Sequence, residues 1–215
     1  MLIRCRAAVY LRNKPQQFRV DFRVRGRDIS PIDRTGNRYF RDRPRLHFWR
    51  LNMSVIVRPM RDDEARTFLE IHGRSIRGLA LAHYPADVIA AWAGPVTATD
   101  NAVRNFLKNT DHEIRLMAEI DGQPVGLGAL VVQNAELRAC YVDPQAARQG
   151  VGSALVKEME RIARDRGLPH LELHASLNAE PFYTALGYEA LEREDHVLRS
   201  GLRMAAVKMR KNLTS

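Results

Sequence analysis

The amino-acid sequence predicts a mixed α/β (α+β) domain, a sheet covered by helices, and three observations lead to this prediction. Three short apolar runs follow one another between Glu113 and Val142 with turn residues between them, which is the pattern of a β-meander. A stretch whose apolar positions recur every three and four residues then begins at Gly150, as in an amphipathic helix. Further apolar runs alternate with helical stretches as far as Met209, so we expect parallel as well as antiparallel neighbours in the sheet.

Helices are expected early in the domain, after a short strand at residues 55–57. Three acidic residues beginning at Asp62 suit the first turn of a helix, and Pro85 can occupy the first position of another. The expected helices span residues 62–81, 85–92 and 101–107.

Turn signals divide the rest of the domain into strands and two further helices. Asp121-Gly122 is a strong hairpin signal, and Gly167 ends the long helix that starts at Gly150. A short helix is expected to stop at Gly187, and the segment from Glu192 to Gly201 is expected to be a connection. The expected strands span residues 113–120, 125–132, 137–142, 171–175, 188–191 and 202–209.

Charge divides the 215-residue chain into two parts. Residues 1–51 contain 14 of the 34 basic residues but only 4 of the 25 acidic ones, so the remainder is almost neutral. The net charge of +9 therefore belongs to the first quarter, and partners must be predicted separately for each part. We expect a basic extension over residues 1–52 and one domain over residues 53–215.

The basic extension has two interpretations. Four apolar residues between Phe18 and Val24 alternate with charged ones, and arginines beside aromatic residues suit contacts with nucleic acid. Alternatively, the segment has no core of its own and is translated upstream sequence ahead of a start at Met53. The second interpretation is favoured because a strand pattern begins at Val55. Nucleic-acid binding is expected only through this extension.

Cysteine usage and hydropathy indicate a cytoplasmic location. Cys5 and Cys140 lie far apart in the sequence, which argues against a disulfide framework and suits a reducing compartment. No apolar run approaches the roughly 18 residues of a membrane span, so no membrane partner is expected. The N-terminus has a single serine and four aspartates, which is not the composition of an organellar targeting peptide.

The start of the long helix is the main candidate for a ligand site. The helix opens with Gly150-Val151-Gly152-Ser153 after a strand and a polar loop. Unpaired N–H groups and the positive end of the helix dipole bind anions at such a turn, and small residues let a ligand approach the amides. A phosphorylated ligand is therefore expected.

Two blocks of sequence resemble the GCN5-related N-acetyltransferase (GNAT) family. The family's loop consists of Arg or Gln, two residues, Gly, one residue, and Gly or Ala, after a strand that often ends in Tyr-Val-x-Pro. Residues 141–152 are similar to this block, with intact glycines but with Ala147 at the first loop position. Residues 173–188 are similar to the family's fifth strand and the following helix. The resemblance covers about residues 54–209.

The resemblance implies both a fold and an activity. The fold would be the acyl-CoA N-acyltransferase fold, with a mostly antiparallel sheet whose fourth and fifth strands splay apart. The implied activity moves an acetyl group from acetyl-CoA to a primary amine by direct attack in a ternary complex, without a metal. The acceptor would be a small-molecule or peptide amine, and a homodimer is left open.

The resemblance also implies site residues. Tyr183 matches the family's general acid, and a phenol with a pKa of about 10 can protonate a leaving thiolate. Asn178 matches a position that contacts the cofactor arm. The strand residues Cys140, Tyr141 and Val142 would pair with the pantetheine amides and supply an N–H to the oxyanion. The residues implied for the pyrophosphate are Arg148, Gln149, Gly150, Val151, Gly152 and Ser153.

The acceptor amine must also lose a proton. Glu136 opens the central strand and could accept this proton through water, and Glu119 on a neighbouring strand is a second candidate. Either residue could equally be a solvated carboxylate at a strand end, with ordered water as the relay.

The acceptor itself is not specified by these motifs. Tyr84 and Trp92 could wall the acceptor site or could be core aromatic residues. Acceptor specificity is expected to depend on residues 72–111 and on the connection 192–201.

Other interpretations of the same residues fit less well. A dinucleotide site would need a third glycine where Leu155 stands and a tight turn after the strand. A lone Cys140 in an apolar strand is more often inert than nucleophilic, and His170 and His174 share one strand face without a third metal ligand. A noncatalytic CoA-sensing module, or a nucleic-acid-binding protein using residues 1–52, is the alternative to an enzyme.

Overall fold

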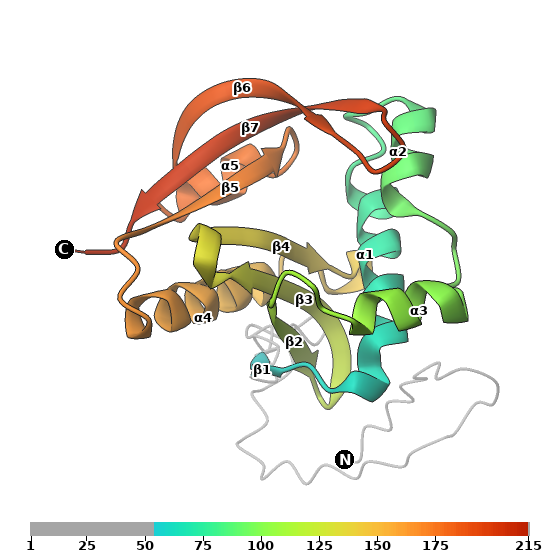
Figure 1. Ribbon diagram of the computed structural model, residues 1–215, viewed down its shortest axis with the longest axis horizontal. Helices are drawn as coiled ribbons and strands as arrows, with labels where there is room; N and C mark the ends of the chain where they lie inside the picture. The colour runs from blue at the N-terminus through green and yellow to red at the C-terminus, as the bar shows by residue number, and fades with distance from the viewer. Residues whose placement is uncertain (1–53, 215) are drawn as a thin grey trace, which may run out of the picture. The chain divides into compact units, whose positions relative to one another are not determined.

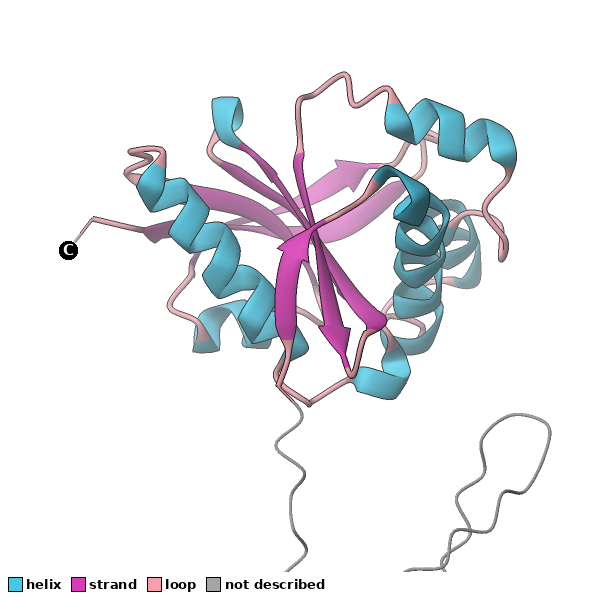
Figure 2. Ribbon diagram, turned by 90° about the horizontal axis from the view of Figure 1, so that it is seen from below, coloured by secondary structure: helices cyan, strands magenta, loops and turns pink. Residues whose placement is uncertain are grey.

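The computed structural model describes residues 54–214, so the predictions for residues 1–52 lie outside the described chain. Within it, helices cover both faces of one sheet (Figure 1, Figure 2). The helices are α1 (Ala65–Leu79), α2 (Ala86–Ala93), α3 (Asp100–Leu107), α4 (Val151–Asp165) and α5 (Glu180–Ala185). The strands are β1 (Ile56–Pro59), β2 (Ile114–Ile120), β3 (Gln123–Val131), β4 (Glu136–Val142), β5 (His170–Ser176), β6 (Glu189–Val197) and β7 (Arg203–Asn212).

The sheet has seven strands in the order β1-β2-β3-β4-β5-β7-β6. All neighbours are antiparallel except β4 and β5, which are parallel and joined through α4. The β2–β3 hairpin turns at Asp121 and Gly122, whose φ angles of 51° and 74° suit the tight turn expected there. The prediction of a mixed, mostly antiparallel sheet is confirmed.

The fourth and fifth strands diverge, as the family resemblance implied. β4 and β5 are aligned at a single pair, Glu136 with Glu172, whereas β5 and β7 are aligned from His170 to Ser176. Figure 1 shows β4 turning away from β5 toward its C-terminal end. The backbone groups of β4 between Cys140 and Val142 therefore face a gap in the sheet.

Side-chain alternation assigns each strand residue to one of two covered faces. In β2, Leu116 and Ala118 belong to a core formed with α4, whereas the intervening Met117 packs with Phe68 and Ile71 of α1. The period of two thus separates an α4 face from an α1 face. The same alternation places consecutive residues of β4 and of β5 on opposite faces of the sheet.

Helix α4 has the boundaries that its glycines predict. Its N-cap is Gly150, with φ of 85°. At its C-terminal end, Leu168 N–H donates to Ala163 O at 3.0 Å and Gly167 N–H donates to Arg164 O at 2.9 Å. This is a Schellman motif, which places a left-handed residue after the helix, and Gly167 has φ of 74°.

The expected connection from Glu192 to Gly201 is wrong for most of its length, because β6 continues to Val197. All side chains of this edge strand except Glu194 are exposed. Because neither face of the strand is buried, its sequence does not need to alternate apolar and polar residues. Main-chain pairing with β7, from Glu189 opposite Arg210 to Val197 opposite Arg203, makes it a strand. None of the helices between residues 54 and 214 is both long and apolar enough to cross a membrane.

Candidate active site

The start of α4 presents free backbone donors. The first hydrogen bond of the helix runs from Ala154 N–H to Gly150 O at 3.0 Å. The three amides of Val151, Gly152 and Ser153 therefore have no acceptor within the helix. A Cβ at Gly150 would meet no atom within 4 Å, so this position needs glycine for its φ angle.

Gly152 has a packing role in addition to the ligand-binding role expected from the sequence. A Cβ at this position would lie 3.1 Å from Cζ of the Phe182 ring and 3.6 Å from a methyl group of Val142. The missing side chain therefore makes room for α5 to pack against the first turn of α4. This contact joins the helix that begins with Val151, Gly152 and Ser153 to the helix that carries Tyr183.

The loop before α4 is supported from Asp143. The Asp143 carboxylate accepts a hydrogen bond from Gln145 N–H at 3.0 Å and pairs with Arg74 Nε at 2.8 Å. Arg148 is exposed with φ of 64°, and the Gln149 side chain donates to Gln145 O at 3.1 Å. Asp143 thus supports a loop in which Ala147 has no polar side chain to contribute.

Cys140 and Tyr183 lie together on the α4 face. Cys140 belongs with the α4 core, and its Sγ lies 3.8 Å from Gly152 O. Tyr183 is buried in the same core. Burial raises the pKa of Cys140 to about 12 and raises the pKa of Tyr183 well above its usual value. Both groups are therefore protonated at neutral pH.

Asn178 contributes a polar atom without a partner. It lies in the turn between β5 and α5, and its Oδ1 is buried with no hydrogen-bond partner among the described residues. A buried amide oxygen left unpaired is unfavourable by about 1–3 kcal/mol. A ligand N–H placed beside Oδ1 would satisfy it.

A cavity of about 380 Å³ opens on the other side of the sheet. Tyr141 of β4 and Ser176 of β5 line it, together with Trp92 of α2 and Met204 of β7. Because Cys140 and Tyr141 are adjacent in β4, their side chains point to opposite faces. The diverging ends of β4 and β5 therefore separate this cavity from Cys140 and Tyr183.

Two aromatic side chains, Trp92 and Tyr141, line the cavity. Trp92 meets Tyr141 edge-on with ring centroids 6.2 Å apart, and His72 meets Tyr141 at 4.5 Å. Burial raises the pKa of Tyr141 to about 12 and lowers the pKa of His72 to about 4, so both rings are neutral. Trp92 therefore has the cavity-lining role that the sequence allowed.

Tyr84 lies behind this wall as a buried tether. It is 8% exposed, and its hydroxyl accepts from Leu177 N–H and donates to Ala205 O, both at 2.7 Å. One side chain thus joins the α1–α2 connection to the end of β5 and to β7. Tyr84 is a core aromatic residue, which is the other of its two expected roles.

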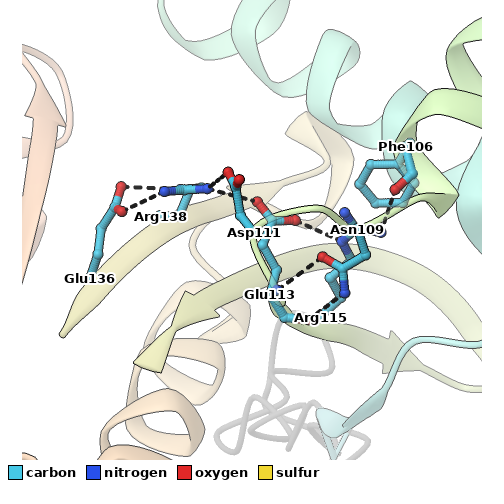
Figure 3. Close-up of polar contacts among 7 residues, drawn as sticks. All are labelled: Phe106, Asn109, Asp111, Glu113, Arg115, Glu136 and Arg138. Atoms are coloured by element: carbon cyan, nitrogen blue, oxygen red, sulfur yellow. Dashed lines mark hydrogen bonds and ion pairs between the residues drawn. The ribbon is translucent and has the colours of Figure 1, made fainter. Parts of the chain in front are cut away.

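Arg138 contacts the acidic side chains that line the cavity (Figure 3). Its guanidinium donates to both carboxylate oxygens of Glu136, at 2.7 and 3.2 Å. It also pairs with Asp111 and lies 3.5 Å from Glu113 Oε1. The hydrogen bonds that Arg138 donates to Glu136 raise the pKa of Arg138 above its usual value. Both oxygens of Glu136, the predicted base, are therefore occupied.

Glu119, the second candidate base, lies elsewhere. It is paired with Arg58, whose Nε donates to Glu119 Oε1 at 3.0 Å, at the β1–β2 edge of the sheet. Glu119 does not line the 380 Å³ cavity.

Several polar residues of the cavity were not singled out as site residues from the sequence, among them Arg138, His174 and His196. His170 and His174 do share one face of β5, as predicted. In the range 54–214, no three His, Cys, Asp or Glu side chains come together as a metal-binding group. His196 and Arg199 belong to the segment 192–201 that was expected to influence acceptor specificity, although His196 lies in a strand rather than in a connection.

Comparison with known proteins agrees with this architecture. Residues 80–213 match the family model of the acetyltransferase (GNAT) domain. The chain belongs to the GNAT family. It is 26% identical over 171 residues to an uncharacterized N-acetyltransferase of Methanocaldococcus jannaschii, covering 74% of this chain and 70% of the relative. Membership of the GNAT family makes this chain an N-acetyltransferase.

Solved GNAT structures superimpose on most of the described chain. A GCN5-related N-acetyltransferase from Rhodopseudomonas palustris matches with a TM-score of 0.67 and 28% identity, covering 74% of this chain and 97% of that one. The PaiA N-acetyltransferase from Thermoplasma acidophilum, solved in complex with coenzyme A, matches with a TM-score of 0.55 and 18% identity, covering 74% and 99%. The second likeness concerns the fold alone.

Proposed function

We propose that this GNAT protein transfers an acetyl group from acetyl-CoA to a primary amine by direct attack in a ternary complex. The observation that carries the proposal is the pair of half-sites on opposite faces of the sheet. Cys140 and Tyr183 lie on one face and the 380 Å³ cavity on the other, with the diverging β4 and β5 between them. A thioester and an amine could meet in this gap without a covalent enzyme intermediate.

The residues of the α4 face fit acetyl-CoA. The free amides at Val151, Gly152 and Ser153 would bind the pyrophosphate, with Arg148, Gln149 and Gly150 completing the loop. The unpartnered Asn178 Oδ1 would accept a hydrogen bond from a pantetheine amide. The unpaired edge of β4 would bind the same arm through its main chain.

Attack of the amine on the thioester makes the carbonyl oxygen negative. A main-chain N–H in the Cys140–Val142 segment would stabilise this oxygen, because the segment faces the gap rather than β5. The C–S bond then breaks, and Tyr183 would donate its proton to the thiolate. A buried phenol that stays protonated suits this role.

The acceptor is an amine that fits the cavity of about 380 Å³, whether a small molecule or a peptide end. Glu136 could relay its proton through water, while each of its oxygens accepts one hydrogen bond from Arg138. We place the domain at residues 53–215 and the reaction in the cytoplasm, which suits two isolated cysteines.

The test is the substitution Tyr183→Phe, assayed by thiol release from acetyl-CoA with a panel of amines. We expect turnover to fall by roughly 10²-fold or more, with little change in acetyl-CoA affinity measured by calorimetry. Tyr188→Phe is the matched control, because it removes another buried hydroxyl nearby, with the two rings 5.6 Å apart. Unchanged turnover in Tyr183→Phe would remove this residue from the mechanism.

A further inference from the structure

A histidine and a glutamate from strands that are not neighbours form a pair at the cavity. His174 of β5 and Glu194 of β6 are joined by a contact of 2.8 Å between Nε2 and Oε1. Strand β7 lies between them, with Lys208 opposite His174 and Ala206 opposite Glu194. Lys208 pairs with Glu172 at 3.5 Å. Because Ala206 has only a methyl side chain, His174 and Glu194 can meet diagonally across β7.

His174 of this pair faces the cavity that is proposed to bind the amine. His174 lines the 380 Å³ cavity together with Tyr141 and Ser176, the residues at the diverging ends of β4 and β5. His196 lines it too, with its ring centroid 5.7 Å from that of His174. In β5 the neighbours of His174, Leu173 and Ala175, pack into the α4 core. The imidazole is therefore on the face opposite Tyr183.

The carboxylates of the same wall are engaged in other bonds. Glu136 and Asp111 both pair with Arg138, and Glu113 pairs with Arg115 at 2.7 Å. His174 is different, because its contact with Glu194 uses Nε2 alone. When Nε2–H donates to the carboxylate, Nδ1 carries a lone pair. Such a carboxylate fixes the tautomer and orientation of an imidazole base.

We propose that His174 is the proton acceptor for the acceptor amine and that Glu194 is its positioning residue. The inference rests on the proposed acetyl transfer. As the N–C bond forms, the amine nitrogen gives one proton to His174 Nδ1, directly or through one water. As the C–S bond breaks, the thiolate takes one proton from Tyr183. Solvent then removes the proton from the imidazolium and returns one to the phenolate, so atoms and charge balance.

The test is the full-length His174→Ala variant, assayed with acetyl-CoA and an amine that the wild-type protein acetylates. We expect kcat to fall by roughly 10²-fold or more, with acetyl-CoA affinity unchanged because the donor half-site is on the other face. Added imidazole should restore part of the lost rate, which loss of a structural side chain would not allow. Glu194→Gln should lower kcat by a smaller factor than His174→Ala.

A matched control comes from the same strand. His170→Ala changes a histidine on the same face of β5 that does not line the cavity. This control should keep the wild-type kcat. A wild-type kcat in His174→Ala, alongside a large loss in Tyr183→Phe, would overturn the role of His174 and leave acetyl transfer standing. A wild-type protein that acetylates no amine would overturn both.

Discussion

The hydroxyl of Tyr84 is a sensitive test of how the cavity wall is held. It binds Leu177 N–H and Ala205 O, both at 2.7 Å, in a side chain that is 8% exposed. Tyr84→Phe keeps the ring and removes only this oxygen. The main-chain groups at 177 and 205 then lose their shared partner inside the protein.

The size of the effect follows from these contacts. Two hydrogen bonds of about 0.5–1.5 kcal/mol each are lost, and a buried group left unpaired adds to this, so we expect a loss of about 2 kcal/mol. For a domain of about 150–250 residues, each kcal/mol lowers the melting temperature by about 2–4 °C, which gives about 4–8 °C here.

The assay is urea and thermal unfolding of the full-length protein, followed by circular dichroism. Tyr188→Phe is the control, because Tyr188 is 2% exposed and its hydroxyl has no partner among the described residues. Its removal should leave stability unchanged or raise it, since no bond is lost and a buried polar group is deleted. Equal losses in the two variants would refute the reasoning, because the hydrogen bonds of Tyr84 would then contribute nothing.

Two further predictions concern titratable groups. Hydrogen bonds from Arg58 lower the pKa of Glu64 to about 2, so its carboxylate stabilises the fold above its ordinary pKa and this contribution is lost as the pH falls toward 2. The urea midpoint should therefore drop between about pH 5 and pH 2, and Glu64→Gln should reduce that drop; an identical pH dependence in the variant would contradict the assignment. Burial raises the pKa of Cys140 to about 12, so peptide mass spectrometry should find this thiol unmodified by iodoacetamide at pH 8 until the protein is unfolded, and rapid labelling of the folded protein would show the site to be open.

The meander, the long helix and their order were predictable because local signals coincide with tertiary packing. Asp121-Gly122 adopts the positive φ angles that a tight hairpin needs, and Gly150 and Gly167 bound α4 with positive φ angles. The apolar period of α4 is the face it buries against the sheet. In such segments the residues that set the local conformation also form the core.

Strand β6 could not be predicted because its side chains carry almost no burial signal. Eight of its nine residues are exposed, and its conformation depends on main-chain pairing with a strand that follows it in sequence. The pairing of His174 with Glu194 was missed for the same reason. The two residues meet only because β7 lies between β5 and β6, and no local spacing encodes such a contact.

The contact between Gly152 and the Phe182 ring fixes the distance between two parts of the proposed acetyl-CoA site. The first turn of α4 is fixed against Phe182, and the next residue in α5 is Tyr183. Cys140 of β4 packs against the same unit, with its Sγ 3.8 Å from Gly152 O. The distance from the amides proposed to bind the pyrophosphate to the proposed acid is therefore set by close packing. A thioester carried on a shorter or longer arm would present its sulfur to the wrong part of the gap.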